Sequence, residues 1–449
     1  MAKRENDLGR DPIGKLLLRL AVPTVTAQLV NALYNIVDRI YIGHIPGEGD
    51  LALTGLGICF PVILFVSAIS ALVGMGGGSR AVVRMGEGKL DEANKILGNC
   101  TLLLMILGLA ATVVFQLCKE PMLYLFGASD ATFPYADAYL SVYLFGTLFV
   151  MIGLGMNPFI NAQGFSRMGM MTVALGAAVN IVLDPIFIFA LDMGVRGAAL
   201  ATVLAQGCSA LWVLKFLTGR RALLRLRWNT LRLQAARVRR ILALGASGFA
   251  MSMTNSLVQV LCNASLQHYG GDLYVGVMTV INSIREVVSM PVQGITNGCQ
   301  PVLGYNYGAG EYERVRRGIR FTTVLTVGYS VAAWALVMAV PELLIRIFND
   351  EPELIAAGIP AFRLYFAAFF CMSFQFIGQS VFVGLGRSRS AVFFSLLRKA
   401  FIVAPLTLLL PGLGMGVDGV FAAEPVSNVL GGLACLLTMY ITVYRRLGR

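Results

Sequence analysis

Long apolar stretches recur along the chain and are separated by short polar links. Each stretch has the roughly 20 mostly apolar residues that a helix needs to cross a bilayer. Hydropathy places six stretches in each half of the chain, near residues 14–43, 51–78, 95–118, 133–158, 166–190, 196–217, 238–266, 274–300, 318–340, 356–383, 390–411 and 418–443. The pattern predicts an all-α membrane protein with twelve transmembrane helices.

The two halves align at one constant shift of 222 residues, without an insertion. The shift places Gly86 on Gly308 and aligns residues 194–197 with residues 416–419. Because each copy has an even number of spans, both copies enter the membrane from the same side. We therefore expect two parallel, pseudo-symmetric six-helix lobes with a cavity between them.

Composition and charge agree with this topology. Hydrophobic residues make up 57% of the 449 residues and charged residues only 13%, against about 25% in a soluble domain. Of the 36 Lys and Arg residues, 30 lie in alternate links and at the two termini. Positively charged links stay cytoplasmic, so we expect a multi-pass protein of the plasma membrane with both termini inside. The net charge of +12 reflects topology, and the sequence predicts no nucleic-acid partner.

The lobes are predicted over residues 1–219 and 238–449, joined by a basic cytoplasmic linker over residues 220–237. We expect this longest inner link to lie on the membrane surface, where it could form an amphipathic helix. The other inner links are short, so the sequence predicts no soluble domain.

A set of oxygen-bearing side chains lies at one depth in the N-terminal lobe. Asp38 ends a polar stripe on the first helix, Asn180 and Asp184 are four residues apart on the fifth, and Thr202 is on the sixth. Counted from the outer helix ends at ~1.5 Å per residue, Asp38, Asp184 and Thr202 all lie roughly 8–10 Å deep. Two carboxylates, an amide oxygen and a hydroxyl suit Na⁺, or the two carboxylates could share a proton.

The repeat acts as an internal control on this interpretation. The shift of 222 converts Asp38 to Val260, Asn180 to Ile402 and Asp184 to Leu406. An ionisable group in the bilayer costs at least ~2.5–3.5 kcal/mol, so the acids need a reason to be there. Their loss from the second copy favours one removable function, cation or proton binding, in the N-terminal lobe.

The C-terminal lobe has its own charged residues within or near the predicted spans: Arg285, Glu286, Arg363, Arg398, Lys399 and Glu424. They could form structural ion pairs, line a cavity or take part in ion coupling. Polar residues that could line a substrate cavity are Gln28, Asn31, Tyr34, Asn35, Asn157, Asn255, Gln259 and Glu286.

Several kinds of chemistry have no support in the sequence. The Gly-rich segment 74–80 lacks the Lys-Ser/Thr ending of a phosphate-binding loop, so the chain is not expected to use ATP by itself. The only two histidines, His44 and His268, lie at outer helix ends, and the eight cysteines are scattered singly. We predict no enzyme activity, no cofactor, and no metal other than Na⁺ at Asp38, Asn180, Asp184 and Thr202.

Four stretches give the chain a resemblance to the multidrug and toxic compound extrusion (MATE) transporters across nearly its whole length: residues 21–23 leading to 34–38, 180–185 and 298–309. The resemblance implies export of amphipathic, often cationic, organic compounds in exchange for Na⁺ or H⁺ moving inward, by alternating access. It assigns cation or proton binding to Asp38, Asn180, Asp184 and Thr202, as in a prokaryotic branch of the family. It also makes Pro23 the point where the first helix bends.

Other functions remain open from the sequence. An exporter of a specific metabolite would look the same, and a lipid-linked oligosaccharide flippase of the same superfamily would usually have more spans and a basic cavity. An ion channel or a non-transporting scaffold fits the buried acids and the two lobes poorly. We expect a functional monomer whose partners are the lipid bilayer and small organic substrates.

Overall fold

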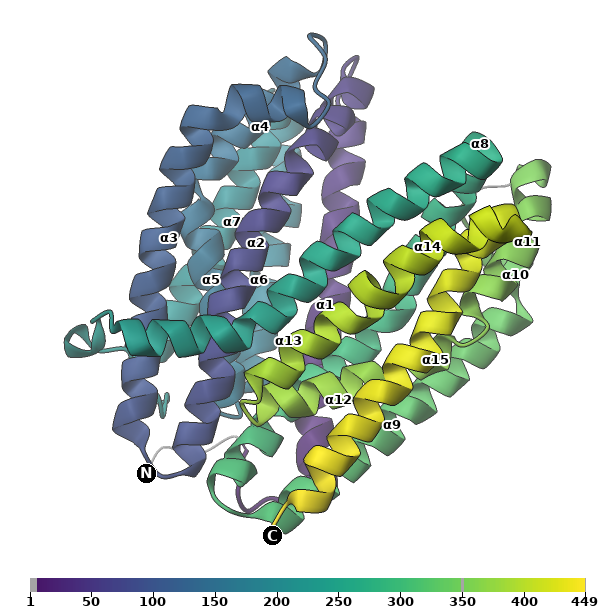
Figure 1. Cartoon of the computed structure of the whole chain (residues 1–449). Helices are drawn as coiled ribbons and strands as arrows, with labels where there is room; N and C mark the ends of the chain where they lie inside the picture. The colour runs from purple at the N-terminus through teal and green to yellow at the C-terminus, as the bar shows by residue number, and fades with distance from the viewer. Residues whose placement is uncertain (1–5, 349–350, 449) are drawn as a thin grey trace.

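The computed structural model describes residues 6–348 and 351–448. Within these residues the chain is helical and contains no strand. The helices form two lobes that meet near the ends of the chain and spread apart at the opposite end, as a V (Figure 1). The predicted all-α fold class is confirmed.

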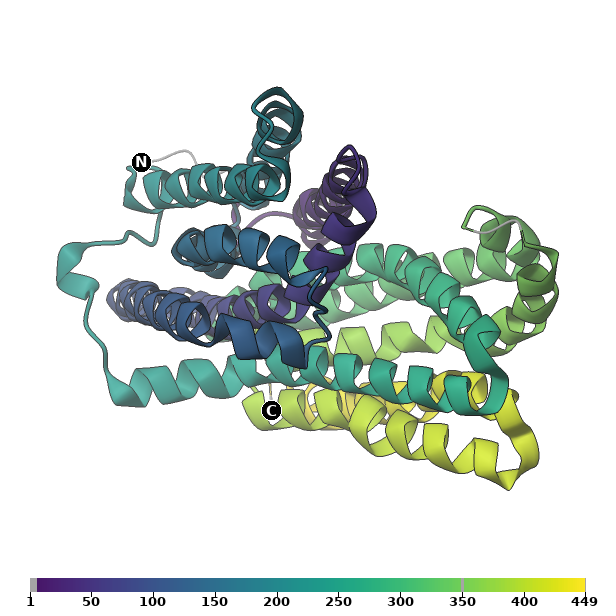
Figure 2. The same cartoon turned by 90° about the horizontal axis from the view of Figure 1, so that it is seen from above.

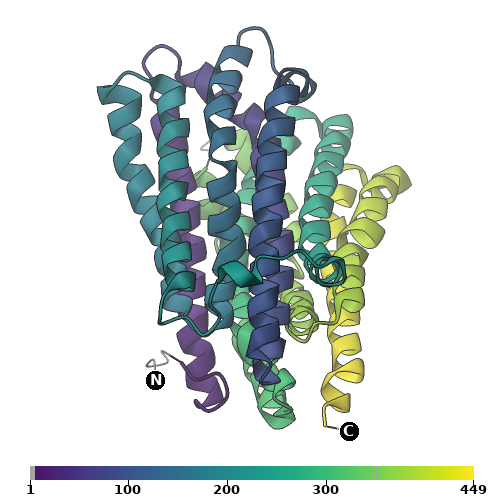
Figure 3. The ribbon, with the colours of Figure 1, turned by 90° about the vertical axis from the view of Figure 1, so that its left-hand side faces the viewer.

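The N-terminal lobe contains the first six spans. They are α1 (Ile13–Gly43), α2 (Gly49–Gly86), α3 (Leu90–Leu125), the pair α4 (Phe133–Phe145) and α5 (Thr147–Ala162), α6 (Ser166–Pro185) with its π-helical extension η1 (Ile186–Ala190), and α7 (Gly194–Thr218). The α4–α5 pair is bent by 58°, and its two helices together are long and apolar enough to form one span. These helices stand side by side across the lobe (Figure 3).

The C-terminal lobe begins with α8 (Ala235–Gly308), whose 74 residues would extend about 110 Å if straight. A bilayer core is only about 30 Å thick, so this helix has to turn back. It does so at Gly271, where φ is 69° and ψ is −166°. The shorter elements that follow are α9 (Tyr312–Ala339), α10 (Pro341–Arg346), α11 (Pro352–Phe366), η3 (Phe369–Cys371) and α12 (Met372–Gly384).

The last two spans, like the two within α8, follow each other without a break in helical structure, from Ser388 to Thr442. They comprise α13 (Ser388–Leu396), η4 (Leu397–Val403), α14 (Ala404–Leu410), η5 (Pro411–Met415), α15 (Gly416–Thr442) and η6 (Tyr444–Arg446). The chain reverses at Gly414 and Gly416, both with positive φ. Length and hydropathy give ten spans among the described residues when the bent pair counts as one. The two composite helices each cross twice, which gives the predicted twelve.

Glycines set the contact between the lobes. A methyl group at Gly86 would overlap the backbone carbonyl of Tyr305, and one at Gly308 would overlap that of Val83. The shift of 222 maps Gly86 to Gly308 and Val83 to Tyr305, so the two contacts are equivalent. The ends of α2 and α8 thus pack backbone to backbone about a pseudo-twofold axis, and they close the V at this end.

The N-terminal segment crosses the closed end of the V. The Asn6 side-chain amide donates to the carbonyl of Gly164 in the N-terminal lobe, at 2.9 Å. The carbonyl of Leu8 accepts from the side chains of Asn306, at 2.9 Å, and Arg314, at 3.3 Å, in the C-terminal lobe. The segment therefore joins the lobes on the side where they already touch.

The link between the lobes differs from the amphipathic helix that its basic sequence could form. It is irregular apart from one 3₁₀ turn, η2 (Trp228–Thr230), and runs along the outside of the N-terminal lobe (Figure 2). The side-chain oxygen of Gln163 accepts from the backbone amides of Leu223 and Leu224, at 2.7 and 2.8 Å. Because the Gln163 side chain satisfies these two amides, neither of them needs a helical hydrogen bond.

Candidate functional site

Three neighbouring helices bring the predicted oxygen-bearing residues of the N-terminal lobe together. Asp38 is on α1, Asn180 and Asp184 are on α6, and Thr202 is on α7. All four are buried, with exposed fractions of 7% for Asp38, 4% for Thr202 and 0% for the other two. The spacing of Asn180 and Asp184 places both on one helical face, as expected for residues four apart.

Asn180 connects the members of this set. Its side-chain amide donates to Asp184 Oδ1 and to Thr202 Oγ1, at 3.3 Å in each case. The side chains of Asp38 and Asp184 lie close to each other. The structure therefore gathers all four residues into one site, which we call the N-lobe site.

Three oxygen atoms in the N-lobe site have no hydrogen-bond partner among the described residues: Asp38 Oδ1, Asn180 Oδ1 and Asp184 Oδ2. A buried acceptor without a partner is costly, and two buried carboxylates also repel each other. A monovalent cation or a proton would relieve both costs. Carboxylate, amide and hydroxyl oxygens are hard ligands of the kind that Na⁺ accepts, so the donor set fits either ion.

The site has a further wall that the sequence analysis did not assign. Tyr34 on α1 and Tyr139 on α4 lie close to the Thr202 side chain. Tyr139 stacks on Tyr143, with ring centroids 6.1 Å apart. These two tyrosines are four residues apart, a spacing that places both side chains on the same face of α4. Nothing in the sequence indicated that this face meets Thr202.

The helix immediately after Asp184 is irregular. Pro185 lacks a backbone N–H, and α6 continues as the π-helical turn of residues 186–190. Such π-turns are often found at functional sites. Pro23, the predicted bending point, is buried inside α1, which runs unbroken from Ile13 to Gly43.

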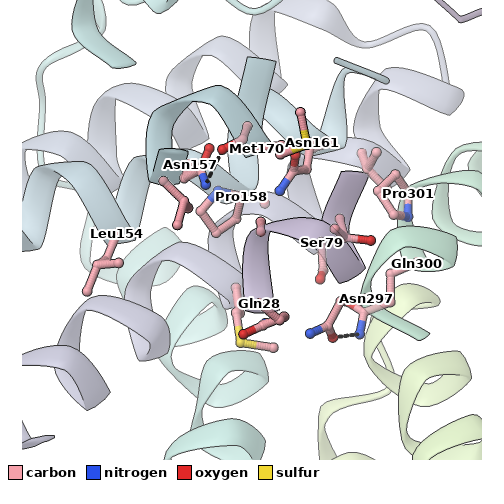
Figure 4. A pocket seen from close by; sticks show the side chains of 18 of the residues that line it. Gln28, Ser79, Leu154, Asn157, Pro158, Asn161, Met170, Asn297, Gln300 and Pro301 are labelled. Carbon is pink, nitrogen blue, oxygen red and sulfur yellow. Dashed lines mark hydrogen bonds between the residues drawn. The ribbon is translucent and has the colours of Figure 1, made fainter. Parts of the chain in front are cut away.

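A cavity of about 260 Å³ lies at the junction of the lobes (Figure 4). Three predicted substrate-cavity residues line it: Gln28, Asn31 and Asn157. Figure 4 shows Asn157 of the N-terminal lobe on one side, and Asn297 of the C-terminal lobe on the other. The cavity is therefore shared between the lobes and carries uncharged polar groups on both walls.

A second cavity, of about 40 Å³, extends from this junction into the N-terminal lobe. It shares Asn31 and Asn157 with the first cavity and is also lined by Tyr34. Since Tyr34 lies close to Thr202, polar groups continue from the junction to the N-lobe site. A change at the site could thus be transmitted to the cavity through α1.

Five polar residues of the junction cavity were not predicted: Thr24, Ser79, Asn161, Asn297 and Gln300. Asn161 follows Asn157 by one helical turn, and this spacing could have identified it. Asn297 and Gln300 face the cavity only because α8 packs beside α1 and α2. That relation depends on tertiary contacts.

The remaining predicted cavity residues lie elsewhere. Asn35 is exposed, and its side-chain amide donates to the carbonyl of Asn31. Asn255 and Gln259 line a separate cavity of about 30 Å³ inside the C-terminal lobe. Glu286 is exposed on α8 and is not among the residues that line these cavities.

The charged residues of the C-terminal lobe divide into two groups. Glu424 on α15 forms buried ion pairs with Arg398 and Lys399, both at 2.8 Å. Arg363, in contrast, is exposed on α11. The structural ion pairs considered from the sequence therefore form at Glu424.

Comparison with known proteins agrees with the fold and its duplication. The sequence model of the MatE family matches residues 23–186 and 248–409, once in each half. The FAD transporter of Shewanella oneidensis is 24% identical over 94% of this chain and 94% of its own length. The multidrug export protein MepA of Staphylococcus aureus is 21% identical over 96% and 94%.

Solved structures of transporters share the architecture. An outward-facing conformation of a multidrug resistance MATE family transporter superposes with a TM-score of 0.91 at 22% identity, and the match covers 98% of both chains. At this identity the likeness concerns the fold alone.

Proposed function

We infer a function from the premise that this chain belongs to the MatE family, and we propose that it is a secondary active exporter of amphipathic or cationic organic compounds. The similarity to MepA, which is named a multidrug export protein, supports this function. The observation that carries it is the N-lobe site, where two buried carboxylates and unpartnered oxygens meet in one lobe only. Such a site gives the exporter a place to bind Na⁺ or H⁺ as its driving ion.

The proposed cycle depends on the competition between ion and organic compound. With the N-lobe site empty, the carboxylates of Asp38 and Asp184 attract a cationic compound toward the junction cavity. An ion or proton entering from outside neutralises the pair and satisfies its unpartnered oxygens. α1 then shifts at Pro23, where a backbone hydrogen bond is already missing, and the compound leaves outward.

The shape of the molecule indicates the stage of the cycle. The lobes touch at the end that carries both termini and separate at the other (Figure 1). If the basic links are cytoplasmic, as the charge distribution predicts, this form faces outward and its closed end lies inside. Inward opening then requires separation of the glycine contacts of α2 and α8, and of the N-terminal segment from Asn306 and Arg314.

The function is tested with purified protein, as the proposed functional monomer, in proteoliposomes loaded with ethidium. A Na⁺ gradient and a pH gradient are imposed separately. One of them should accelerate ethidium transport well above the rate in protein-free vesicles, and which one does so identifies the coupling ion. Transport that responds to neither gradient would refute secondary active export.

A second candidate function is export of a specific metabolite, which the similarity to an FAD transporter favours. Competition distinguishes the two functions. A multidrug exporter should transport several unrelated organic cations with similar efficiency. A metabolite exporter should instead show one substrate that displaces all others, with FAD as the first compound to examine.

A further inference from the structure

The C-terminal lobe carries a basic site at the position that corresponds to the N-lobe site. The shift of 222 places Glu424 on Thr202 and Tyr365 on Tyr143. In the N-terminal lobe this position is surrounded by two acids. In the C-terminal lobe, Arg285, Arg398 and Lys399 surround it instead, with Glu424 as the acid among them.

The geometry of this basic site is well defined. Glu424 Oε1 accepts from Arg398, at 2.8 Å, and from Lys399, at 3.0 Å, and Glu424 Oε2 accepts from Lys399, at 2.8 Å. Arg398 also donates to Asn428 Oδ1, at 2.6 Å. All three charged side chains of this triad are at least 96% buried, with exposed fractions of 3% or 4%. Glu424 is thus fully engaged by two bases.

Arg285 is the third base and has no acid of its own. Among the described residues it forms no salt bridge, and its Nε is buried without a hydrogen-bond partner. Arg398 Nε is unpartnered as well. The neighbouring Glu286 is exposed and is not in the cavity that Arg285 lines. The site therefore holds three positive charges against one negative charge.

This imbalance requires a physical explanation. An arginine does not lose its proton in a protein, so the excess charge cannot be relieved at Arg285 or Arg398. An unpaired charge in the membrane costs at least ~2.5–3.5 kcal/mol. A purely structural ion pair would contain equal numbers of acids and bases. The extra bases instead leave N–H donors available, and an anion would satisfy them.

The cavity beside these bases has room for such a group. It measures about 30 Å³, and its polar lining consists of Asn255, Gln259, Asn282, Arg285, Tyr365, Lys399 and Glu424. A cavity of roughly 10–15 Å³ already admits one water molecule, so a monatomic anion or one carboxylate head group fits. Gln259 is exposed, which gives the cavity an opening on this side of α8.

We propose that the C-terminal lobe binds an anion between Arg285 and Lys399, as the charge-inverted counterpart of the N-lobe site. The ligand is either a free halide or the carboxylate of an organic molecule, and the same donors recognise both. This inference does not depend on the proposed export function, because binding alone tests it.

The experiment measures thermal stabilisation of the purified full-length protein in detergent. Chloride is titrated against a methanesulfonate background, which is neither a halide nor a carboxylate, at constant ionic strength, and benzoate serves as the organic carboxylate. The key variant is Arg285→Gln, which leaves the hydrogen bonds of Glu424 to Arg398 and Lys399 in place. Its matched control is Arg363→Gln, which removes the same charge from an exposed position.

We expect saturable stabilisation of the unmodified protein and of Arg363→Gln, and a loss of about tenfold or more in apparent affinity for Arg285→Gln. Arg285→Lys should recover part of the affinity because it keeps the charge. A response to chloride identifies a free halide as the ligand, and a response to benzoate alone identifies an organic carboxylate. No saturable response to either, or equal responses in the Arg285→Gln and Arg363→Gln variants, would overturn the proposal.

Discussion

Glu424→Gln should strongly destabilise the C-terminal lobe. The substitution removes the negative charge that Arg398 and Lys399 share at 2.8 Å, and it leaves both bases buried without a counterion. Breaking a buried ion pair from one side typically costs about 3–5 kcal/mol. The matched control is Glu342→Gln, whose partner Arg346 is 2.7 Å away but where both side chains are more than 50% exposed. Exposed pairs contribute only about 0.2–1 kcal/mol.

The assay is equilibrium unfolding in detergent, followed by tryptophan fluorescence. Trp212 and Trp228 are replaced by Phe in every variant, so that the signal comes from Trp334 in α9 of the same lobe. When Lys399→Gln is combined with Glu424→Gln, only Arg398 is left without its counterion, whereas Glu424→Gln alone leaves both Arg398 and Lys399 without one. The double variant should therefore be less destabilised than the sum of the single variants, by roughly 1–3 kcal/mol. Equal costs for Glu424→Gln and Glu342→Gln, or strict additivity, would refute the charge argument.

Three further predictions concern the closed end of the V. Gly308→Ala should hold the lobes apart there and slow ethidium efflux at least tenfold, whereas Gly328→Ala, whose added methyl group has no atom within 4 Å, should transport normally. Arg314→Ala loses donors to the N-terminal segment and should speed proteolysis of residues 6–12, and unchanged cleavage would contradict this role. Lys95 and Arg237 hold the pKa of Glu92 below its ordinary value of 4.5. The stabilisation from this carboxylate is therefore complete above pH 4.5 and is lost as the pH falls below that value. Proteolysis of the linker should accordingly rise in acid. In Glu92→Gln, which has no carboxylate to protonate, proteolysis of the linker should not rise as the pH falls.

The sequence predicted the architecture because its signals are local or periodic. Apolar stretches of sufficient length and a constant repeat define twelve spans in two lobes without any knowledge of contacts. The N-lobe residues were grouped by helical spacing and depth, and the hydrogen bonds of Asn180 to Asp184 and Thr202 show that these residues meet. Their role in ion binding remains a prediction.

Features that depend on partners distant in the sequence were not predictable in the same way. The linker was considered as an amphipathic helix, but Gln163, about 60 residues away, binds its backbone amides. Tyr139 and Asn297 reach their sites only through the packing of α4 and α8 against other helices. Asn255 and Gln259 were predicted as cavity-lining residues in the same way as Gln28 and Asn31, yet they line a different cavity.

The central claim is that ion coupling resides in the N-terminal lobe alone. The most direct test compares gradient-driven ethidium efflux in proteoliposomes containing the unmodified protein, Asp184→Asn or Glu286→Gln. Both variants remove one acid, but only Asp184 belongs to the N-lobe site. Asp184→Asn, like Asp38→Asn, should abolish the response to the driving gradient while the protein stays folded, and Glu286→Gln should keep it. A response that survives in Asp184→Asn and disappears in Glu286→Gln would contradict the account.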